Sequence, residues 1–87
     1  MRKILCYDLV KAYPNDYKAL IEYITDTLHG VQATESVWVF FSEEKNNTIL
    51  KNRFRKFMDS NDKLLVADLP IGVSCVNLKD TDKWIKK

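Results

Sequence analysis

Two stretches of the chain repeat their apolar residues with the period of a helix. The first can begin at an N-cap formed by Asn15 or Asp16, and Gly30 follows it as a helix terminator. The second begins near Asn46 or Asn47 and ends at a run of turn-forming residues. The pattern predicts two amphipathic helices, each with one buried stripe. The stripes are Tyr17, Leu20, Ile21, Ile24 and Leu28 in the first helix and Leu50, Phe54, Phe57 and Met58 in the second.

The remaining apolar stretches are short and rich in β-branched and aromatic residues, as is typical of strands. Two of them are close enough to form a hairpin that turns near Glu35. Pro70 stops another, because proline cannot donate a hydrogen bond to a sheet. The predicted strands are Arg2 to Val10, Val31 to Thr34, Ser36 to Phe41, Lys63 to Leu69 and Val73 to Leu78.

The order of these elements is strand, helix, strand, strand, helix and strand, with one extra strand at the end. With right-handed crossovers, this order predicts an α+β domain of the ferredoxin-like βαββαβ plan. Its four-stranded antiparallel sheet would carry both helices on one face. We assign residues 1–78 to this single domain and residues 79–87 to a charged C-terminal tail.

The predicted sheet is apolar on both faces, because the alternating positions of its main strands are both occupied by apolar residues. An antiparallel sheet with one face in water is normally polar on that side, and two helices cover one face only. A second copy that packs sheet against sheet would cover the other face and form a two-fold homodimer. The extra strand could then pair with the partner's sheet edge. We assign Tyr7, Trp38 and Phe40 to the dimer interface.

The same three aromatic side chains allow another interpretation, a base-stacking platform like that of RNA-recognition domains. Such platforms carry basic and glycine residues among their aromatics. Here the neighbours are Val37, Val39 and Leu65, which favours burial in a dimer core.

Composition excludes several classes of protein. The chain has 87 residues, 46% of them hydrophobic, which suits one domain with one core. Its formal net charge of +2 is far from that of a strongly basic nucleic-acid coat, so any contact with a polyanion must come from clustered charges. No apolar run approaches the ~18 residues that cross a bilayer. Cys6 and Cys75 have no zinc-type spacing and no secretory signal before them, so we expect a cytoplasmic protein with reduced thiols.

A cluster of cations on the second helix is the candidate surface for RNA or DNA. Contacts of these side chains with the phosphate backbone would weaken steeply with salt. A solvated helix face is the alternative, because Glu43, Glu44 and Asp59 lie close enough in the sequence to dilute the field. The cluster consists of Lys51, Arg53, Arg55 and Lys56, with Lys45 just ahead of it.

Asp8 is the candidate catalytic and metal-binding residue, because it places a carboxylate at the end of an apolar strand. With Asp8 of a second copy it could hold Mg²⁺ or Mn²⁺ through oxygen ligands and activate water against a phosphodiester. Alternatively, it accepts hydrogen bonds from backbone amides of the loop at residues 11–15, or it pairs with a nearby lysine. Asp68 could assist Asp8, or it could be a charge that protects a sheet edge from aggregation.

Three segments carry a resemblance to a known family: Tyr7-Asp8-Leu9, Ser36-Val37-Trp38-Val39 and the run at 59–66. In this order and spacing they resemble the SinR-like small proteins, in the superfamily of the CRISPR-associated Cas-two proteins and VapD-like toxins. The similarity covers about residues 3–69. It implies a ferredoxin-like subunit, a sheet-to-sheet dimer and, in the nuclease members, a divalent metal held by the carboxylate pair at the position of Asp8.

The chain departs from the acquisition-system members directly after this carboxylate. Those members continue with further acidic residues and an arginine pair, whereas here Lys11 is the lone charge before Pro14. The sequence therefore leaves two hypotheses. One is a Cas-two-like dimeric nucleic-acid-binding protein, a candidate metal-dependent endoribonuclease or endonuclease centred on the Asp8 pair. The other is a catalytically inactive protein-interaction module, such as a regulatory protein or phage-encoded inhibitor, on the same dimer scaffold.

Overall fold

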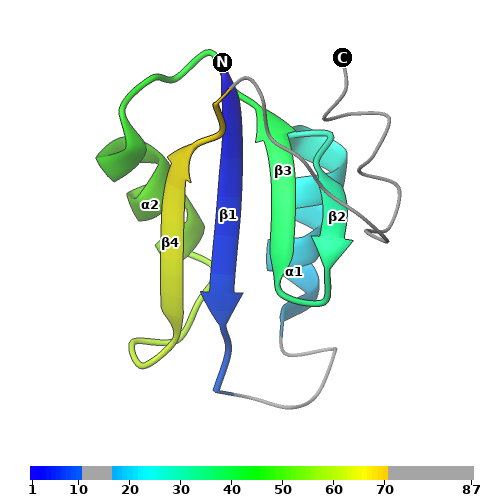
Figure 1. Ribbon diagram of the computed structural model, residues 1–87. Coiled ribbons are helices and arrows are strands. Elements are labelled where there is room, and N and C mark those ends of the chain that lie inside the picture. Colours follow the sequence, from blue (N-terminus) through cyan, green and yellow to red (C-terminus); the bar gives the residue numbers. More distant parts are fainter. Residues whose placement is uncertain (11–16, 71–87) are drawn as a thin grey trace.

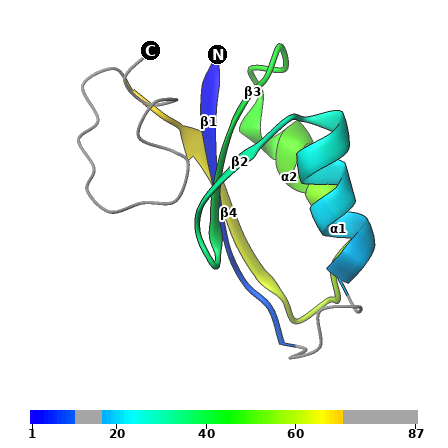
Figure 2. The same cartoon turned by 90° about the vertical axis from the view of Figure 1, so that its right-hand side faces the viewer.

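Four strands form one antiparallel sheet, and the helices lie together on one of its faces (Figure 1). This computed structural model describes residues 1–10 and 17–70. The strand order is β2-β3-β1-β4, so β4 and β2 are the edges of the described sheet. Figure 2 shows α1 and α2 on the same side of the sheet. The elements are β1 (Arg2–Asp8), α1 (Lys18–Glu22), η2 (Tyr23–Thr27), β2 (Val31–Thr34), β3 (Val37–Phe41), α2 (Asn47–Arg55) and β4 (Lys63–Asp68).

This architecture confirms the α+β class, the antiparallel four-stranded sheet and the two helical segments that the hydrophobic pattern predicted. The expected hairpin is present, since β2 pairs with β3 in antiparallel register. Three predictions lie outside the described residues: the helix cap at Asn15 or Asp16, the strand Val73 to Leu78, and the tail at 79–87.

The first helical segment changes its geometry before it ends. The α-helical turns of α1 continue into η2, a π-helical stretch that closes with a 3.1 Å hydrogen bond from the Leu28 amide to the Tyr23 carbonyl. His29 then adopts the left-handed conformation with φ 53°, one residue before Gly30, the helix terminator expected from the sequence. Glycine is required at position 30 for a different reason: a Cβ there would lie 2.7 Å from Cγ2 of Ile24.

The second helix begins where the sequence predicted. Asn46 is its N-cap, and the Asn46 side chain accepts hydrogen bonds from the amides of Thr48 (2.9 Å) and Ile49 (3.2 Å). The helix ends at Arg55, and a 3.0 Å hydrogen bond from the Phe57 amide to the Phe54 carbonyl forms the turn that follows.

The core lies between the helices and the sheet, and it contains the stripes predicted for both helices. Phe54 of α2 is its central aromatic residue: its ring meets those of Phe40 and Tyr23 edge to face, each at a centroid distance of 5.7 Å. Tyr23 also stacks on Phe57 at 5.0 Å. The fully buried side chains in this layer include Leu5, Leu20, Ile24, Phe40, Leu50 and Phe54.

The assignment of Tyr7, Trp38 and Phe40 to a dimer interface requires correction. All three lie on the helix-covered face: Trp38 and Phe40 belong to the core of the subunit, and Tyr7 packs against that core. The indole Nε1 of Trp38 donates a 2.9 Å hydrogen bond to the Tyr7 hydroxyl. Burial raises the pKa of Tyr7. The alternation of apolar residues identified two sets of positions, but it did not show which set faces the helices.

The opposite face of the sheet carries the other set of alternating residues, because paired residues in neighbouring strands point to the same side. No described helix covers this face. We call it the bare face. In β1, β3 and β4 it consists of Arg2, Ile4, Cys6, Asp8, Val37, Val39, Phe41, Lys63, Leu65 and Ala67. Val31 of β2 pairs with Val39 on the same side, and Val39 is only 2% exposed.

Candidate functional site

Asp8 lies at the end of β1, on the bare face, where the sequence predicted a strand-end carboxylate. Its partner in the neighbouring strand is Lys63, the first residue of β4. Both side chains are exposed, and both line a shallow hollow of about 290 Å³. The other lining residues are Cys6, Tyr7, Leu64 and Leu65. The site thus places one carboxylate and one ammonium side by side at an open, largely apolar surface.

The Asp8 carboxylate makes no hydrogen bond and no ion pair within the described part of the chain. A different residue binds the backbone where β1 ends. Asp62 accepts hydrogen bonds from the Val10 amide (2.8 Å), the Tyr17 hydroxyl (2.9 Å) and the Asp59 amide (2.8 Å). Asp62 therefore has the structural role that the sequence offered as an alternative for Asp8. The loop at residues 11–15, named in that alternative, lies outside the described residues.

The structure supplies few ligands for a metal ion in one subunit. Across residues 1–10 and 17–70, no three side chains of His, Cys, Asp or Glu converge. Asp8 offers the carboxylate oxygens that Mg²⁺ and Mn²⁺ prefer, and it faces solvent. These residues fit a divalent ion only if a second copy contributes its own Asp8.

Asp68 does not assist Asp8. The strand register places Asp68 opposite Lys3, at the other end of β4 and on the helix-covered face, whereas Asp8 pairs with Lys63. Asp68 forms an ion pair with Lys3, whose side chain is 0% exposed. The expectation of an isolated edge charge is therefore replaced by a specific internal partner.

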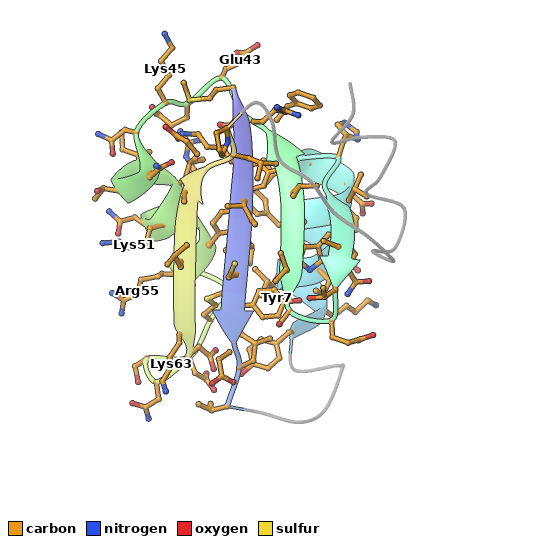
Figure 3. The ribbon with its side chains drawn as sticks, in the orientation of Figure 1. Tyr7, Glu43, Lys45, Lys51, Arg55 and Lys63 are labelled. Carbon is orange, nitrogen blue, oxygen red and sulfur yellow. The ribbon has the colours of Figure 1, made fainter. Side chains whose placement is uncertain are left out.

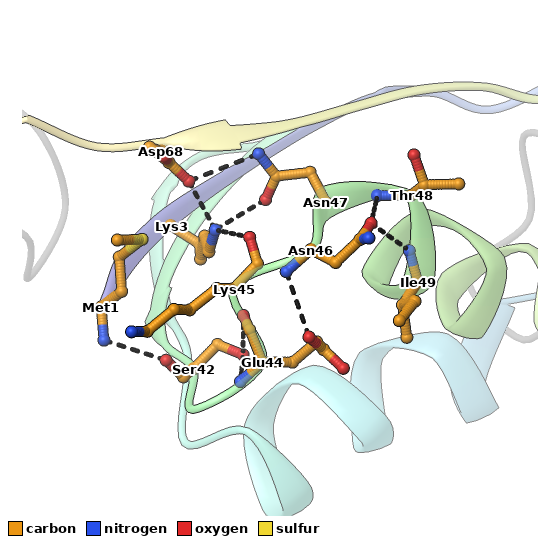
Figure 4. Close-up of polar contacts among 10 residues, drawn as sticks. All are labelled: Met1, Lys3, Ser42, Glu44, Lys45, Asn46, Asn47, Thr48, Ile49 and Asp68. Atoms are coloured by element: carbon orange, nitrogen blue, oxygen red, sulfur yellow. Dashed lines mark hydrogen bonds and ion pairs between the residues drawn. The ribbon is translucent and has the colours of Figure 1, made fainter.

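The buried ammonium of Lys3 is the polar group that the sequence reasoning missed (Figure 4). Its Nζ donates to the Asn47 side-chain oxygen at 2.7 Å, to the Lys45 carbonyl at 3.1 Å and to the Asp68 carboxylate. Three acceptors match the three protons of an ammonium group, so each of its donors has a partner. Lys3 thereby joins β1, β4 and the start of α2.

The ion pair between Lys3 and Asp68 predicts a pH dependence of stability. The hydrogen bond from Lys3, with a second one from Asn47, holds the pKa of Asp68 below its ordinary value. Because the folded-state pKa is depressed, the stabilisation is complete above the unfolded-state pKa of about 4 and is lost as the pH falls through the lower folded-state value. Urea unfolding across this acidic range should therefore show a steeper loss in the wild type than in Lys3→Met. If the free energy of unfolding falls equally with pH in the wild type and in Lys3→Met, the role assigned to the Lys3–Asp68 ion pair is wrong.

The predicted basic cluster is exposed, but its members do not form one surface. Arg53 is paired with Glu44 at 3.8 Å. Lys51 and Arg55 project from α2 toward the side of the molecule where β4 lies (Figure 3). Lys56 caps the helix at its C-terminal end. The structure therefore separates Arg53 from the cations that face outward beside β4.

Comparisons with known proteins identify the fold and no family. A scan against models of protein families finds no match, and a search of curated proteins finds none either. Among solved structures, the chain is similar to the crystal structure of a hypothetical protein, TT1823, from Thermus thermophilus. The two share 18% sequence identity with a TM-score of 0.65, over 86% of this chain and 88% of that one. At this identity the likeness shows a shared fold alone.

The helices of residues 17–70 are all short. No helix in the described part of the chain is long and apolar enough to cross a membrane.

Proposed function

We propose that this protein is a sheet-to-sheet homodimer that binds nucleic acid and cleaves phosphodiester bonds with Mg²⁺ or Mn²⁺ at paired Asp8 carboxylates. The proposal extends the resemblance to the SinR-like proteins of the Cas-two superfamily. The observation that carries it is the position of Asp8, which lies on the bare face that a second copy would cover. A ferredoxin-like subunit is part of the proposal, and the strand order β2-β3-β1-β4 with both helices on one face supports it.

The exposed apolar surface of the bare face supports the dimer. Leu65 is 56% exposed and Phe41 is 52% exposed, and Ile4, Cys6 and Val37 between them are partly exposed. Val39, between Val37 and Phe41 on the same face, is 2% exposed and adds no surface to the patch. The remaining exposed apolar surface favours association, since burying it gains about 25 cal/mol per Å². A two-fold axis near the end of β1 would bring the two Asp8 side chains together.

In such a dimer the residues of the chain have separate roles. The two Asp8 carboxylates would supply the protein ligands, and water molecules would complete an oxygen-only shell. A divalent ion held there supplies Lewis-acid stabilisation of a phosphate and a more acidic bound water. The neighbouring Lys63 ammonium partly offsets the negative charge of Asp8, which would otherwise repel a phosphate.

One observation favours the second candidate function, a catalytically inactive protein-interaction module. Lys63 stands directly opposite Asp8 in the sheet, and an ammonium in that position competes with a metal ion for the carboxylate. In that case Asp8 and Lys63 only set the local charge of the dimer surface, and the binding partner is another protein.

A cleavage assay on RNA and DNA with Mn²⁺ tests the catalytic proposal. We expect Asp8→Asn to lower the cleavage rate at least about 100-fold, because several kcal/mol of transition-state stabilisation depend on the bound ion. The matched control is Glu43→Gln, which changes an exposed carboxylate at the opposite end of the molecule and should leave the rate unchanged.

Two results would remove the catalytic proposal. One is equal activity in the wild type and in Asp8→Asn, which would indicate a contaminating nuclease. The other is no cleavage by either protein under any of the tested conditions. Both outcomes would leave the interaction module as the remaining function.

A further inference from the structure

Most of the described cations that have no carboxylate partner lie on one side of the molecule. Within residues 1–10 and 17–70, Lys3, Lys18 and Arg53 each form an ion pair with an acidic residue. Arg2 donates a hydrogen bond to the Pro70 carbonyl. In the same described ranges, five exposed cations form no ion pair. One of them, Lys56, is the C-cap residue of α2. The other four lie together along one side of the fold (Figure 3): Lys45, Lys51, Arg55 and Lys63. We call these four residues the basic edge.

The fold explains why these residues align. Lys51 and Arg55 are four positions apart on α2, so they project from the same side of the helix. Lys45 precedes the helix, and Lys63 begins β4, the edge strand beside which α2 lies. In Figure 3 the row descends from Lys45 to Lys63. It therefore ends at the hollow that contains Asp8.

Helix stability does not account for the row. A cation near a helix C-terminus is favourable, which explains Arg55 in the last turn of α2. Lys45 stands just before the N-cap Asn46, where the helix dipole disfavours positive charge. Lys63 lies on no helix. Moreover, residues 45–58 contain no Asp or Glu that would neutralise the charges locally. Like charges held together in this way favour a polyanionic ligand.

We propose that the basic edge binds successive phosphates of a nucleic-acid backbone and that Lys63 contacts the phosphate that lies nearest to Asp8. This inference rests on the proposed nucleic-acid binding and assigns the residues that perform it. It adds Lys63 to the predicted surface, leaves out Lys56, the C-cap residue of α2, and removes Arg53, whose charge is already paired with Glu44 at 3.8 Å. The contacts involve phosphate alone, so they do not distinguish between sequences.

The number of phosphate contacts can be determined from the way the binding constant changes with salt concentration. We would measure the binding of a short labelled oligothymidylate, and of a duplex of equal length, by fluorescence anisotropy over a range of salt concentrations without divalent metal. Four contacts predict a slope of log K against log salt of about −2.8 for the single strand and about −3.6 for the duplex. The better-bound form identifies the natural conformation of the ligand.

Single Lys→Gln or Arg→Gln changes then test each member. Each change in the basic edge should make the slope shallower by about 0.7 on a single strand or about 0.9 on a duplex. Arg53→Gln and Lys18→Gln are matched controls, because each removes one exposed cation that is already in an ion pair, and both should leave the slope unchanged. Circular dichroism of each variant confirms that the exposed substitution leaves the fold intact.

The possible failures are distinguishable. If the wild type binds neither oligonucleotide, the proposed nucleic-acid binding and the proposed role of the basic edge are both wrong. If the wild type binds but the four substitutions leave the slope unchanged, nucleic-acid binding stands and the basic edge is wrong. If only Lys63→Gln has no effect, the contact beside Asp8 is wrong.

Discussion

Replacing Leu65 by aspartate is expected to convert the proposed dimer into monomers. Leu65 is the most exposed large apolar side chain of β4, at 56%, and it lies on the bare face opposite Cys6. In a two-fold interface the substitution would bury two carboxylates without partners. We expect the dissociation constant to rise at least about 100-fold, equivalent to about 2.7 kcal/mol. Sedimentation velocity over a range of protein concentrations measures this change.

The matched control for this prediction is Ile49→Asp. Ile49 is also an exposed apolar residue, at 41%, but it lies in the first turn of α2 and not on the bare face. A carboxylate at that position is favourable for the helix, so the variant should fold and remain dimeric. Trp38→Glu is expected to unfold the subunit and not merely to dissociate it, because Trp38 is a core residue. A wild type that stays monomeric at high concentration would contradict the dimer itself.

The local pattern of the sequence was sufficient to predict the elements. Period and composition identified both helical stripes, and the polar run before residue 48 indicated the N-cap that Asn46 forms. These features depend on residues within one or two turns of each other. They are therefore visible in a single sequence without knowledge of the packing.

The same pattern could not assign the two faces of the sheet. Leu5 and Ile4 are equally apolar, yet Leu5 is buried under the helices and Ile4 lies on the bare face. A period of two residues shows that strand positions alternate, but only the packing of the helices decides which set they cover. Tyr7, Trp38 and Phe40 were placed on the wrong face for this reason.

The candidate site was predictable in part. The position of Asp8 at a strand end followed from the apolar run before it. A lysine beside Asp8 was one of the alternatives, but its identity as Lys63 was not predictable, because the pairing of β1 with β4 joins residues 55 positions apart and depends on the strand register. The roles of Asp62 and Lys3 were also not predictable, since all the partners of Lys3 and two of those of Asp62, Val10 and Tyr17, lie more than 40 residues away in the sequence.

The buried lysine gives the prediction with the largest expected effect on stability. We expect Lys3→Ala to lower the free energy of unfolding by about 3 kcal/mol, because it removes three hydrogen bonds from a charged group and leaves a cavity where the aliphatic stem packed. Lys3→Met keeps most of that volume and removes the charge, so it should change stability by less than about 1 kcal/mol. Urea denaturation of both variants measures the difference.

Asp68 provides the decisive comparison, because it is the only carboxylate that contacts Lys3 in the described part of the chain. Asp68→Asn leaves an ammonium in the core without its counterion, so it should destabilise the protein even though Asp68 itself is largely exposed. In the background of Lys3→Met, Asp68→Asn should leave the free energy of unfolding almost unchanged, since no buried charge remains. Equal effects of Asp68→Asn in the two backgrounds would mean that the ion pair contributes nothing. The contribution of Lys3 to stability would then come from the packing of its stem and from its hydrogen bonds to Asn47 and Lys45.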